Sequence, residues 1–287
     1  MKLGLIGKAI LNSSAPDLHV RLGKLTGIET SYELFDADEL SLASLEAAVQ
    51  QVMAAGYRGV NVTYPFKEQV IGLADRISDG ARMVGSANTL VFQDGSILAE
   101  NTDFTGFMSG YRASLGEREP GRVLLIGTGG VGKAVAFGVT QLGATEVLLV
   151  DIDTARAERL AEELVRFGFG ARALPSDQVA DEAASCNGLI NCTPIGHEKS
   201  PGCPLPPQLV QSHHWVFDAV YVPAVTELIA AARAADASVM SGVSLFVFQG
   251  VDAFKHFCED DDKRAAADQQ AAALFAHYRR QLLGHNG

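Results

Sequence analysis

One glycine-rich run in the middle of the chain limits its fold more than any other feature. Residues 122–134 read RVLLIGTGGVGKA, an apolar stretch typical of a buried strand, then a turn and the start of a helix. Gly127, Gly129 and Gly132 fit the pattern GxGxxG. The first glycine makes the tight turn, the second lets the backbone approach a pyrophosphate, and the third allows close helix packing. This run predicts a dinucleotide-binding βαβ unit, with the phosphates at the helix N-terminus.

A glycine turn can also mark a plain strand-to-helix reversal, so the residues that follow it matter. A second apolar run, residues 147–150, ends in Asp151. This is the distance at which dinucleotide-binding folds place an acid on the ribose 2′-hydroxyl. Strand and helix patterns then alternate, which indicates a parallel α/β sheet. The expected elements are a helix to about Gly143, a helix through Leu160 and Leu164, strands 171–174, 188–192, 215–220 and 238–240, a helix 224–234 and a helical run from Phe246.

The front of the chain also reads as α/β. A strand is expected at 2–6, a polar loop at 7–19, a helix at 43–55, a strand at 59–63, a hairpin with its turn at Asp94 and Gly95, and a helix at 106–115. Two features are ambiguous. The loop at 7–19 could bind a ligand or be capped by its own serines. Lys67 follows a strand's carboxyl end, where α/β proteins bind ligands, but an isolated lysine there can equally be a solvated one.

Composition narrows the class of protein. The net charge is −11, which argues against nucleic acid or an anionic membrane as the partner. The four cysteines contain no CxxC pair and are too few for a disulfide scaffold. No signal peptide or membrane-length apolar segment is recognisable, so we expect a soluble cytoplasmic protein. The acidic residues 259–262 predict a solvated turn or helix start, and no metal site is expected.

Several short motifs occur together along nearly the whole chain. They are Ser13 with Pro16 and His19; residues 61–67 (NVTYPFK); Asn88 and Thr89; residues 101–103 (NTD); residues 191–196 (NCTPIG); Asp218 with Tyr221 and Pro223; and Gly242 with Gln249. In this order they resemble the shikimate/quinate dehydrogenase family. The joint match is more specific than the glycine turn, which many unrelated dehydrogenases share.

The resemblance implies an α/β fold of two domains with a cleft between them. An N-terminal α/β substrate domain would comprise residues 1–104 and 242–287, with a C-terminal helix returning to it. A Rossmann dinucleotide-binding domain would comprise residues 105–241. The implied activity is reversible hydride transfer between shikimate and a nicotinamide cofactor.

By the same resemblance, Lys67 and Asp103 are expected to form the catalytic pair. Removing a hydride from a secondary alcohol leaves a ketone only if the hydroxyl proton also departs, so a positioned base is needed. Lys67 is the expected base. Burial would favour its neutral form and a nearby carboxylate would oppose it, so Asp103 would chiefly hold the lysine and the hydroxyl in line. Which of the two moves the proton stays open.

The resemblance also assigns binding roles. For the substrate, Asn88 and Gln249 would hold ring hydroxyls, Asn61 and Thr63 would support them, and Ser13 with Tyr221 would reach the carboxylate. The cofactor residues would be Gly127, Thr128, Gly129, Gly130, Val131, Gly132, Asp151, Asp153, Arg156, Thr193, Ala219 and Gly242.

Two positions depart from the family pattern. The first loop has Asn12, Ser13, Ser14, Ala15 and Pro16 where the family has SxSP, so one hydroxyl is missing. A hydrogen bond to a charged group contributes roughly 1.5 to 3 kcal/mol, so we expect altered substrate preference or weaker turnover. Shikimate is the first choice, and quinate, which is bulkier at the carboxylate-bearing carbon, is the alternative.

The second departure follows the strand that ends at Val150. Relatives that use NADP resemble NRTxxR there, whereas this chain reads DIDTAR, with an isoleucine for the first arginine. An acid accepts a bond from a free ribose hydroxyl and repels a 2′-phosphate, so NAD is expected over NADP. Arg156 is kept and leaves NADP possible.

Two rival functions remain at this point. One is a noncatalytic paralogue that binds a nucleotide or metabolite, which intact Lys67 and Asp103 disfavour. The other is a related enzyme acting on a folate or an amino-substituted ring, which the many hydroxyl-binding candidates disfavour. The expected partner is a small hydroxylated cyclohexene or cyclohexane carboxylate, and the expected assembly is a monomer or homodimer.

Overall fold

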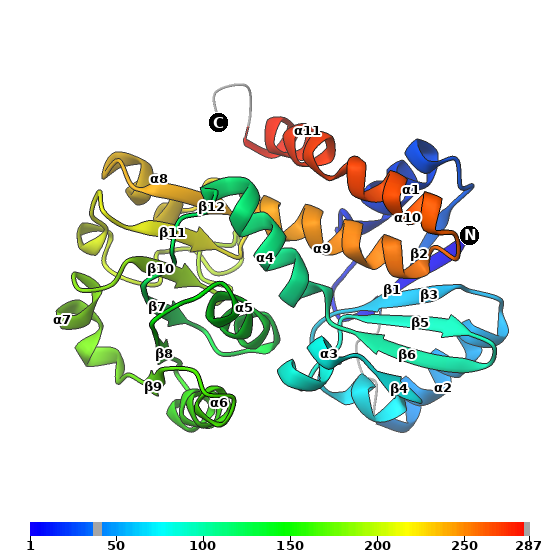
Figure 1. Ribbon diagram of the computed structural model, residues 1–287, viewed down its shortest axis with the longest axis horizontal. Coiled ribbons are helices and arrows are strands. Elements are labelled where there is room, and N and C mark those ends of the chain that lie inside the picture. Colours follow the sequence, from blue (N-terminus) through cyan, green and yellow to red (C-terminus); the bar gives the residue numbers. More distant parts are fainter. Residues whose placement is uncertain (37–41, 284–287) are drawn as a thin grey trace. The chain divides into compact units, whose positions relative to one another are not determined.

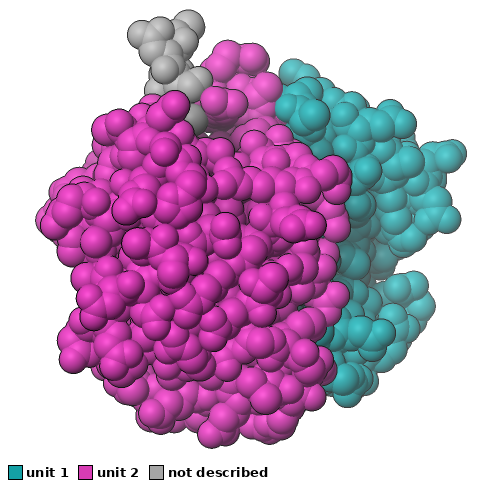
Figure 2. All heavy atoms as spheres, turned by 60° about the vertical axis from the view of Figure 1, so that its left-hand side comes forward, with its two compact units in different colours: residues 1–106, 247–274 teal, residues 107–246, 275–287 magenta. Residues whose placement is uncertain are grey.

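The computed structural model describes residues 1–36 and 42–283, which form two compact units (Figure 2). Unit 1 comprises Met1–Gly106 and Val247–Leu274, and unit 2 comprises Phe107–Phe246 and the segment that starts at Phe275. The chain therefore returns to unit 1 after building unit 2. The expected domain limits, 104/105 and 241/242, remain a prediction.

Unit 1 is built on a mixed six-stranded sheet in the order β2-β1-β3-β5-β6-β4 (Figure 1). Strand β1 pairs in parallel with β2 and β3, whereas β5 is antiparallel to both β3 and β6. The strands are β1 (Lys2–Gly7), β2 (Ser31–Asp36), β3 (Gly59–Val62), β4 (Arg76–Ile77), β5 (Thr89–Gln93) and β6 (Ser96–Glu100).

This pairing brings several chain segments to one edge of the sheet. Because β5 runs against its neighbours, its amino end lies beside the carboxyl ends of β3 and β6, and β1 ends at the same edge because it is parallel to β3. The segments that follow β1, β3 and β6, and the residue that precedes β5, therefore meet at the same edge. Those segments carry most of the substrate and catalytic residues expected from the sequence.

Helices cover the sheet of unit 1. Leu45, Val49 and Val52 of α2 pack with Val60 and Val62 of β3 in a buried core. Helices α1 and α9 pack closely, since a Cβ on Gly250 would lie 2.4 Å from Leu18 Cδ2. The helical segments are α1 (Ala15–Thr26), α2 (Leu42–Ala54), the 3₁₀ turn η1 (Gln69–Leu73), α3 (Asp79–Val84), α4 (Thr102–Leu115), α9 (Gly242–Phe257) and α10 (Asp261–Gln269), with α4 and α9 each continuing between units.

Unit 2 contains six parallel strands in the order β12-β11-β10-β7-β8-β9 (Figure 1). Counted from β7, this is the 3-2-1-4-5-6 order of a Rossmann fold. The strands are β7 (Arg122–Ile126), β8 (Glu146–Val150), β9 (Ala171–Ala173), β10 (Gly188–Asn191), β11 (Trp215–Asp218) and β12 (Ser238–Ser241). Leu124, Leu148, Leu189 and Val216 are fully buried, as expected of parallel strands with both faces covered.

The helices of unit 2 connect these strands. Apolar residues of α7 and α8, such as Ala183 and Leu228, join the buried core of the sheet. The helical segments are α5 (Gly130–Gln141), α6 (Thr154–Arg166), the 3₁₀ turn η2 (Ser176–Gln178), α7 (Val179–Ala183), the 3₁₀ turn η3 (Pro207–Leu209), α8 (Glu227–Ala234) and α11 (Ala271–Leu283), whose first residues belong to unit 1.

Four expected helix boundaries were wrong by three residues or more. Helix α9 starts at Gly242 and not near Phe246, and the other three have an explanation in the residues at the helix start. The loop expected at 7–19 ends early, because α1 starts at Ala15 with Pro16 in its first turn. Helix α4 starts at Thr102, because Asn101 Oδ1 accepts a hydrogen bond from the Phe104 amide 3.1 Å away. Helix α8 starts three residues later than expected, because the Thr226 hydroxyl caps it.

Other expected elements agree with the structure. Asp94 and Gly95 both have positive φ, 52° and 74°, in the two-residue turn between β5 and β6. The acidic run begins a helix, since Asp260 Oδ1 accepts from the Asp262 amide at the start of α10. The sequence analysis missed α1, β2, β4, α3 and α7. Among the described residues, no helix is long and apolar enough to cross a bilayer.

Candidate functional site

Lys67 and Asp103 meet at the strand edge of unit 1. Lys67 follows β3 through a turn that contains the cis Tyr64–Pro65 bond, and Asp103 lies in the first turn of α4. The lysine Nζ donates to Asp103 Oδ2 at 2.6 Å, and the two side chains are 13% and 7% exposed. The N-terminus of α4 stabilises the carboxylate. A shielded amine and carboxylate in contact can hold and move one proton.

Asn88 joins the start of α4 to β5. Its Oδ1 accepts from the Thr102 amide at 2.7 Å and from the Thr89 hydroxyl at 3.1 Å. Its Nδ2 lies 2.9 Å from Thr102 Oγ1 and 3.4 Å from Gln249 Oε1. Since Thr102 directly precedes Asp103, the amide of Asn88 fixes the position of the helix turn that carries the carboxylate.

Asn61 is held by a tyrosine that the sequence analysis did not select. Tyr32 donates its hydroxyl to Asn61 Oδ1 at 2.9 Å, and Asn61 Nδ2 donates to Thr89 Oγ1 at 3.0 Å. The Tyr32 ring stacks on His19 with centroids 4.7 Å apart. Burial raises the pKa of Tyr32 well above its usual value and lowers that of His19 to about 3, so this stack is neutral. His19 is therefore a core residue here.

Gln249 reaches this network because two helices cross very closely. A Cβ on Gly106 of α4 would lie 2.4 Å from the backbone nitrogen of Gln249 on α9. Only glycine allows this approach, which places Gln249 Oε1 beside Asn88 Nδ2. Gly106 is thus a positioning residue. The sequence analysis did not select it, because Gly106 belongs to none of the recognised motifs.

Ser13 and Thr63 lie in the loops after β1 and β3. Ser13 Oγ accepts from the Ala15 amide at 3.2 Å, just before α1, and its hydroxyl hydrogen is not used in that bond. Thr63 is partly buried, and its Cγ2 occupies the place where a Cβ on Gly7 would lie. Amides, hydroxyls and one ammonium group together suit a ligand rich in hydroxyls with a carboxylate.

The glycine loop of unit 2 has the geometry of a phosphate site. Gly127 has φ of 95°, and a Cβ on Gly132 would lie 1.8 Å from the Gly127 carbonyl oxygen. A Cβ on Gly129, at the start of α5, would meet no atom within 4 Å. The chain's own packing thus requires the outer glycines but not the middle one. Open space at Gly129 is what the close approach of a pyrophosphate needs.

Asp151 braces this loop from the end of β8. Its Oδ2 accepts from both the amide and the hydroxyl of Thr128 at 2.7 Å, and its Oδ1 accepts from the Asp153 amide at 3.0 Å. Burial acts to raise the pKa of Asp151, but these hydrogen bonds and the charge of Arg156 lower it on balance. Asp151 is therefore an ionised brace, with lone pairs left to accept a ribose hydroxyl.

The two residues after Asp151, Ile152 and Asp153, form the tip of the loop that follows β8, and one is apolar and the other acidic. Asp153 is 59% exposed and caps α6 through a bond from the Arg156 amide to its Oδ1 at 3.2 Å. The Ile152 side chain is fully exposed. Gly130 and Val131 form the first turn of α5 beside this loop. No cation occupies position 152, where the family pattern has its first arginine.

The other expected cofactor residues follow neighbouring strands of the same sheet. Thr193 follows β10 and packs against the glycine loop, since a Cβ on Gly127 would lie 2.7 Å from Thr193 Cγ2. Gly242, after β12, has no room for a Cβ, which would lie 2.6 Å from the Ala219 carbonyl oxygen. With Asp151 after β8, these residues all lie at the carboxyl edge of the sheet, where open α/β sheets bind ligands.

A buried carboxylate ties these loops together. Asp218 Oδ1 accepts from Asn191 Nδ2 at 2.9 Å and the Val220 amide at 3.0 Å, and its Oδ2 accepts from the Thr226 hydroxyl at 2.6 Å. Burial raises the pKa of Asp218 to about 6, although these hydrogen bonds act to lower it. Asn191 in turn accepts from the amide and hydroxyl of Thr193. The family motif contained Asp218, but the sequence assigned it no role.

Tyr221 belongs to unit 2. Its ring stacks on Phe246 with centroids 5.1 Å apart and an angle of 9°. Burial raises the pKa of Tyr221, so its hydroxyl is a neutral donor.

The expected site residues divide between the two units. Unit 1 contains Lys67, Asp103, Asn61, Asn88, Thr63, Ser13 and Gln249, and unit 2 contains Tyr221 and the twelve expected cofactor residues. The described residues contain no group of three or more His, Cys, Asp or Glu that could hold a metal.

Comparison with known proteins gives a consistent family. The family model of the shikimate dehydrogenase substrate binding domain matches residues 5–90. A shikimate dehydrogenase (NADP(+)) from Pseudarthrobacter chlorophenolicus is 38% identical over 89% of this chain and 88% of that protein. A quinate/shikimate dehydrogenase (NAD(+)) from Corynebacterium efficiens is 34% identical over 92% of this chain and 96% of that protein.

A solved structure is similar over almost the full length. It is the quinate dehydrogenase from Corynebacterium glutamicum in complex with NAD. The TM-score is 0.87 and the identity 31%, covering 96% of this chain and 99% of that one.

Proposed function

Because the chain belongs to the shikimate and quinate/shikimate dehydrogenase family, we propose that it reversibly oxidises shikimate to 3-dehydroshikimate with a nicotinamide dinucleotide. The observation that carries this proposal is the 2.6 Å contact between Lys67 and Asp103 beside a set of buried amides and hydroxyls. A noncatalytic binding protein would not need a shielded amine and carboxylate in contact. Both units are needed, since unit 1 carries this pair and unit 2 the dinucleotide loop.

The proposed chemistry at Lys67 is general base and acid catalysis. In the direction of oxidation, its neutral amine accepts the proton of the substrate hydroxyl, and in reduction its ammonium returns that proton. Asp103 keeps the Lys67 Nζ in one position through the 2.6 Å bond, so that the amine stays in line with the substrate hydroxyl. When bound, the nicotinamide supplies the complementary step by accepting or donating a hydride.

Polar side chains beside the pair would orient the ring. Asn88 and Gln249 are within 3.4 Å of each other and offer amide donors and acceptors to vicinal hydroxyls. Asn61 and Thr63 support them from β3 and the turn after it. The free hydroxyl hydrogen of Ser13, together with the neutral hydroxyl of Tyr221, would bind the carboxylate. Such hydrogen bonds to a charged group contribute roughly 1.5 to 3 kcal/mol each.

For the cofactor, the proposal is NAD in preference to NADP. The residues present fit a dinucleotide, because Gly129 leaves space for phosphate and Gly127 and Gly132 shape the turn. Asp151 is ionised and Asp153 exposed at the place where a 2′-phosphate would lie, and like charges repel. The similar proteins include both NADP(+) and NAD(+) enzymes, so only kinetics separates the two.

Quinate is the second proposed substrate. One observation favours it: position 15, where the family loop has a serine, is an alanine whose amide already bonds to Ser13 Oγ. A smaller side chain there leaves room for the extra hydroxyl on the carboxylate-bearing carbon of quinate. The solved quinate dehydrogenase with a TM-score of 0.87 is consistent with this choice.

One assay tests the proposal. Purified protein is incubated with NAD or NADP and with shikimate or quinate, and nicotinamide absorbance is followed. We expect NAD to be reduced when shikimate is the substrate, and quinate to be the second active substrate. Silence in all four combinations, in a protein that still binds NAD by calorimetry, would reject the dehydrogenase proposal.

Assembly and location complete the proposal. The four cysteines all lie among the described residues and form no disulfide there, which fits a reducing cytoplasm. We expect a monomer or homodimer, which light scattering after size-exclusion chromatography would distinguish.

A further inference from the structure

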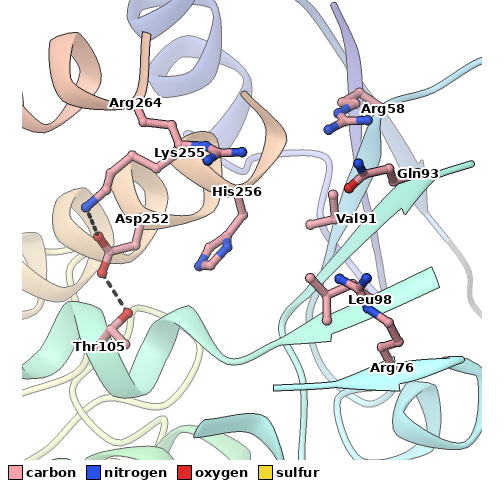
Figure 3. A pocket seen from close by; sticks show the side chains of 10 residues that line it. All are labelled: Arg58, Arg76, Val91, Gln93, Leu98, Thr105, Asp252, Lys255, His256 and Arg264. Atoms are coloured by element: carbon pink, nitrogen blue, oxygen red, sulfur yellow. Dashed lines mark hydrogen bonds and ion pairs between the residues drawn. The ribbon is translucent and has the colours of Figure 1, made fainter. Parts of the chain in front are cut away.

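One cavity in unit 1 is lined by none of the residues expected to bind substrate or cofactor. It has a volume of about 570 Å³, within the range of small-molecule sites. Side chains of β4, β5 and β6 form one wall, and side chains of α9 and α10 face them (Figure 3). Thr105 of α4 contributes to the same cavity.

The charge of the lining is opposite to that of the whole chain. Four permanent cations line the cavity, Arg58, Arg76, Lys255 and Arg264, against one carboxylate, Asp252. The chain as a whole has 34 acidic and 23 basic residues. A concentration of cations in a concave site of an acidic protein attracts and focuses anions.

Two of these arginines are held in place by backbone carbonyls. Arg58 donates from Nε to the Phe257 oxygen at 2.9 Å and from Nη1 to the Phe92 oxygen at 3.1 Å. Arg264 donates from Nε and Nη2 to the Cys258 oxygen at 3.0 and 2.9 Å. These contacts fix the guanidinium groups without neutralising them, so they are ordered before any ligand arrives.

The carboxylates paired with these arginines are at the surface. Glu259, which lies 3.2 Å from Arg58, is 78% exposed, and Asp261, which lies 2.7 Å from Arg264, is 91% exposed. Exposed ion pairs contribute only about 0 to 1 kcal/mol, so a better placed anion can compete with them.

Arg76 provides the cation that the protein's own groups leave unused. It is exposed on β4, and among residues 1–36 and 42–283 its side chain makes no hydrogen bond or ion pair. Its planar guanidinium can bind a phosphoryl group through two parallel hydrogen bonds. Figure 3 shows it beside Leu98, across the cavity from His256.

The floor of the cavity is apolar. Val91, which is 2% exposed, and Leu98 lie between the cationic side chains (Figure 3). Apolar side chains below several cations accommodate the carbon skeleton of an organic anion, while the cations bind its charged group. The cavity volume also exceeds what one phosphate needs.

We propose that this cavity binds a small phosphorylated organic metabolite at a site separate from the dehydrogenase site. Arg76 contacts the phosphoryl group directly, and Arg58 and Arg264 supply the surrounding positive potential. Lys255 adds little to it, because it is paired with Asp252 at 3.2 Å and with Asp268 at 2.7 Å. The site is defined by unit 1 alone, so it does not depend on the proposed reaction.

Inorganic pyrophosphate is the probe that tests this site. Calorimetric titration is carried out with saturating NAD, so that the glycine loop of unit 2 is filled. Arg76→Glu should weaken pyrophosphate binding about tenfold or more, because it replaces a hydrogen-bonded charge by a repulsive one. Arg82→Glu is the matched control, since Arg82 is also an exposed arginine of unit 1 but lies outside the cavity. The affinity of Arg82→Glu for pyrophosphate should stay within about threefold of that of the wild type, a difference of roughly 0.6 kcal/mol in binding free energy.

Two results would overturn the proposal. One is a wild-type dissociation constant weaker than about 1 mM for pyrophosphate. The other is equal weakening by Arg76→Glu and Arg82→Glu, which would show a general charge effect. The Arg76 side chain has no partner among the described residues, and the Arg82 side chain makes one exposed hydrogen bond, to the Ile77 oxygen at 3.3 Å. Both variants should therefore fold, and circular dichroism with thermal unfolding checks that they do.

Discussion

Lys67 and Asp103 are 36 positions apart in the sequence, and their side chains are 2.6 Å apart in the fold. Two structural features bring them together. The turn after β3 carries the lysine, and α4 begins directly after β6 at the same edge of the sheet. The contact is thus a consequence of strand direction.

Lys67→Ala should remove the proton acceptor without disturbing the dinucleotide loop, which belongs to the other unit. We expect kcat to fall roughly 10²- to 10⁴-fold, the contribution typical of a general base, with NAD affinity unchanged by calorimetry. Lys24→Ala, on the exposed side of α1, is the control and should keep wild-type kcat. If Lys67→Ala keeps more than about a tenth of the wild-type kcat, Lys67 is not the base.

The NAD preference should weaken when the tip after β8 becomes basic. Ile152→Arg combined with Asp153→Asn adds a phosphate partner and removes a repulsive charge, while asparagine can still cap α6. We expect kcat/KM with NADP relative to NAD to rise about tenfold or more. Ile152→Gln with Asp153→Asn is the control without the added positive charge, and it should raise this ratio of kcat/KM values less. A wild-type enzyme that already favours NADP would show that Asp151 and Asp153 do not select the cofactor.

Tyr32→Phe should destabilise unit 1. Asn61 is 7% exposed, so loss of the tyrosine hydroxyl leaves its Oδ1 without that donor in a buried position. The free energy of unfolding should fall by about 1 to 3 kcal/mol, measured by urea denaturation. Tyr64→Phe removes a hydroxyl from a tyrosine that is 72% exposed. It should change the free energy of unfolding by less than about 0.5 kcal/mol. Equal effects of the two variants would mean that the Tyr32 bond to Asn61 contributes nothing.

Ala15→Ser should move substrate preference toward shikimate. The variant restores a hydroxyl at the start of α1, close to Ser13, whose Oγ accepts from the residue 15 amide. We expect kcat/KM for shikimate to rise about tenfold relative to quinate, the size of one hydrogen bond to a carboxylate. Steady-state kinetics with both substrates measures this, and unchanged constants for both would show that position 15 does not touch the substrate.

Local signals predicted the glycine loop and the parallel sheet of unit 2, because turn, strand and helix are each encoded there by neighbouring residues. They failed for β2, which is an edge strand with no fully buried residue and so lacks a strong apolar alternation. The contact between Tyr32 and Asn61 depends on register. Tyr32 lies opposite Leu3 and Asn61 opposite Leu5 on the two sides of β1, so the tyrosine reaches across a strand. No local pattern contains such a contact.

Asp218 should make the stability of unit 2 depend on pH. Burial raises its folded-state pKa to about 6, above the usual value of 3.8, so the native state holds this proton more tightly than the unfolded state does. Its contribution is therefore full below about pH 4 and is lost as the pH rises through about 6. The total is about 2 to 3 kcal/mol, from roughly two pKa steps of 1.4 kcal/mol each.

Asp218→Asn isolates this effect, because an amide mimics the protonated acid. Its Oδ1 can still accept from Asn191 and Val220, and its Nδ2 can donate to the Thr226 hydroxyl. The free energy of unfolding of the wild type relative to Asp218→Asn should fall between pH 4.5 and pH 7.5, by roughly 1 to 2 kcal/mol because the titration is already under way at the lower pH. Urea denaturation at several pH values measures this difference. A difference that stays constant, or rises with pH, would mean that the carboxylate is ionised in the folded protein throughout this range and that its three hydrogen bonds outweigh its burial.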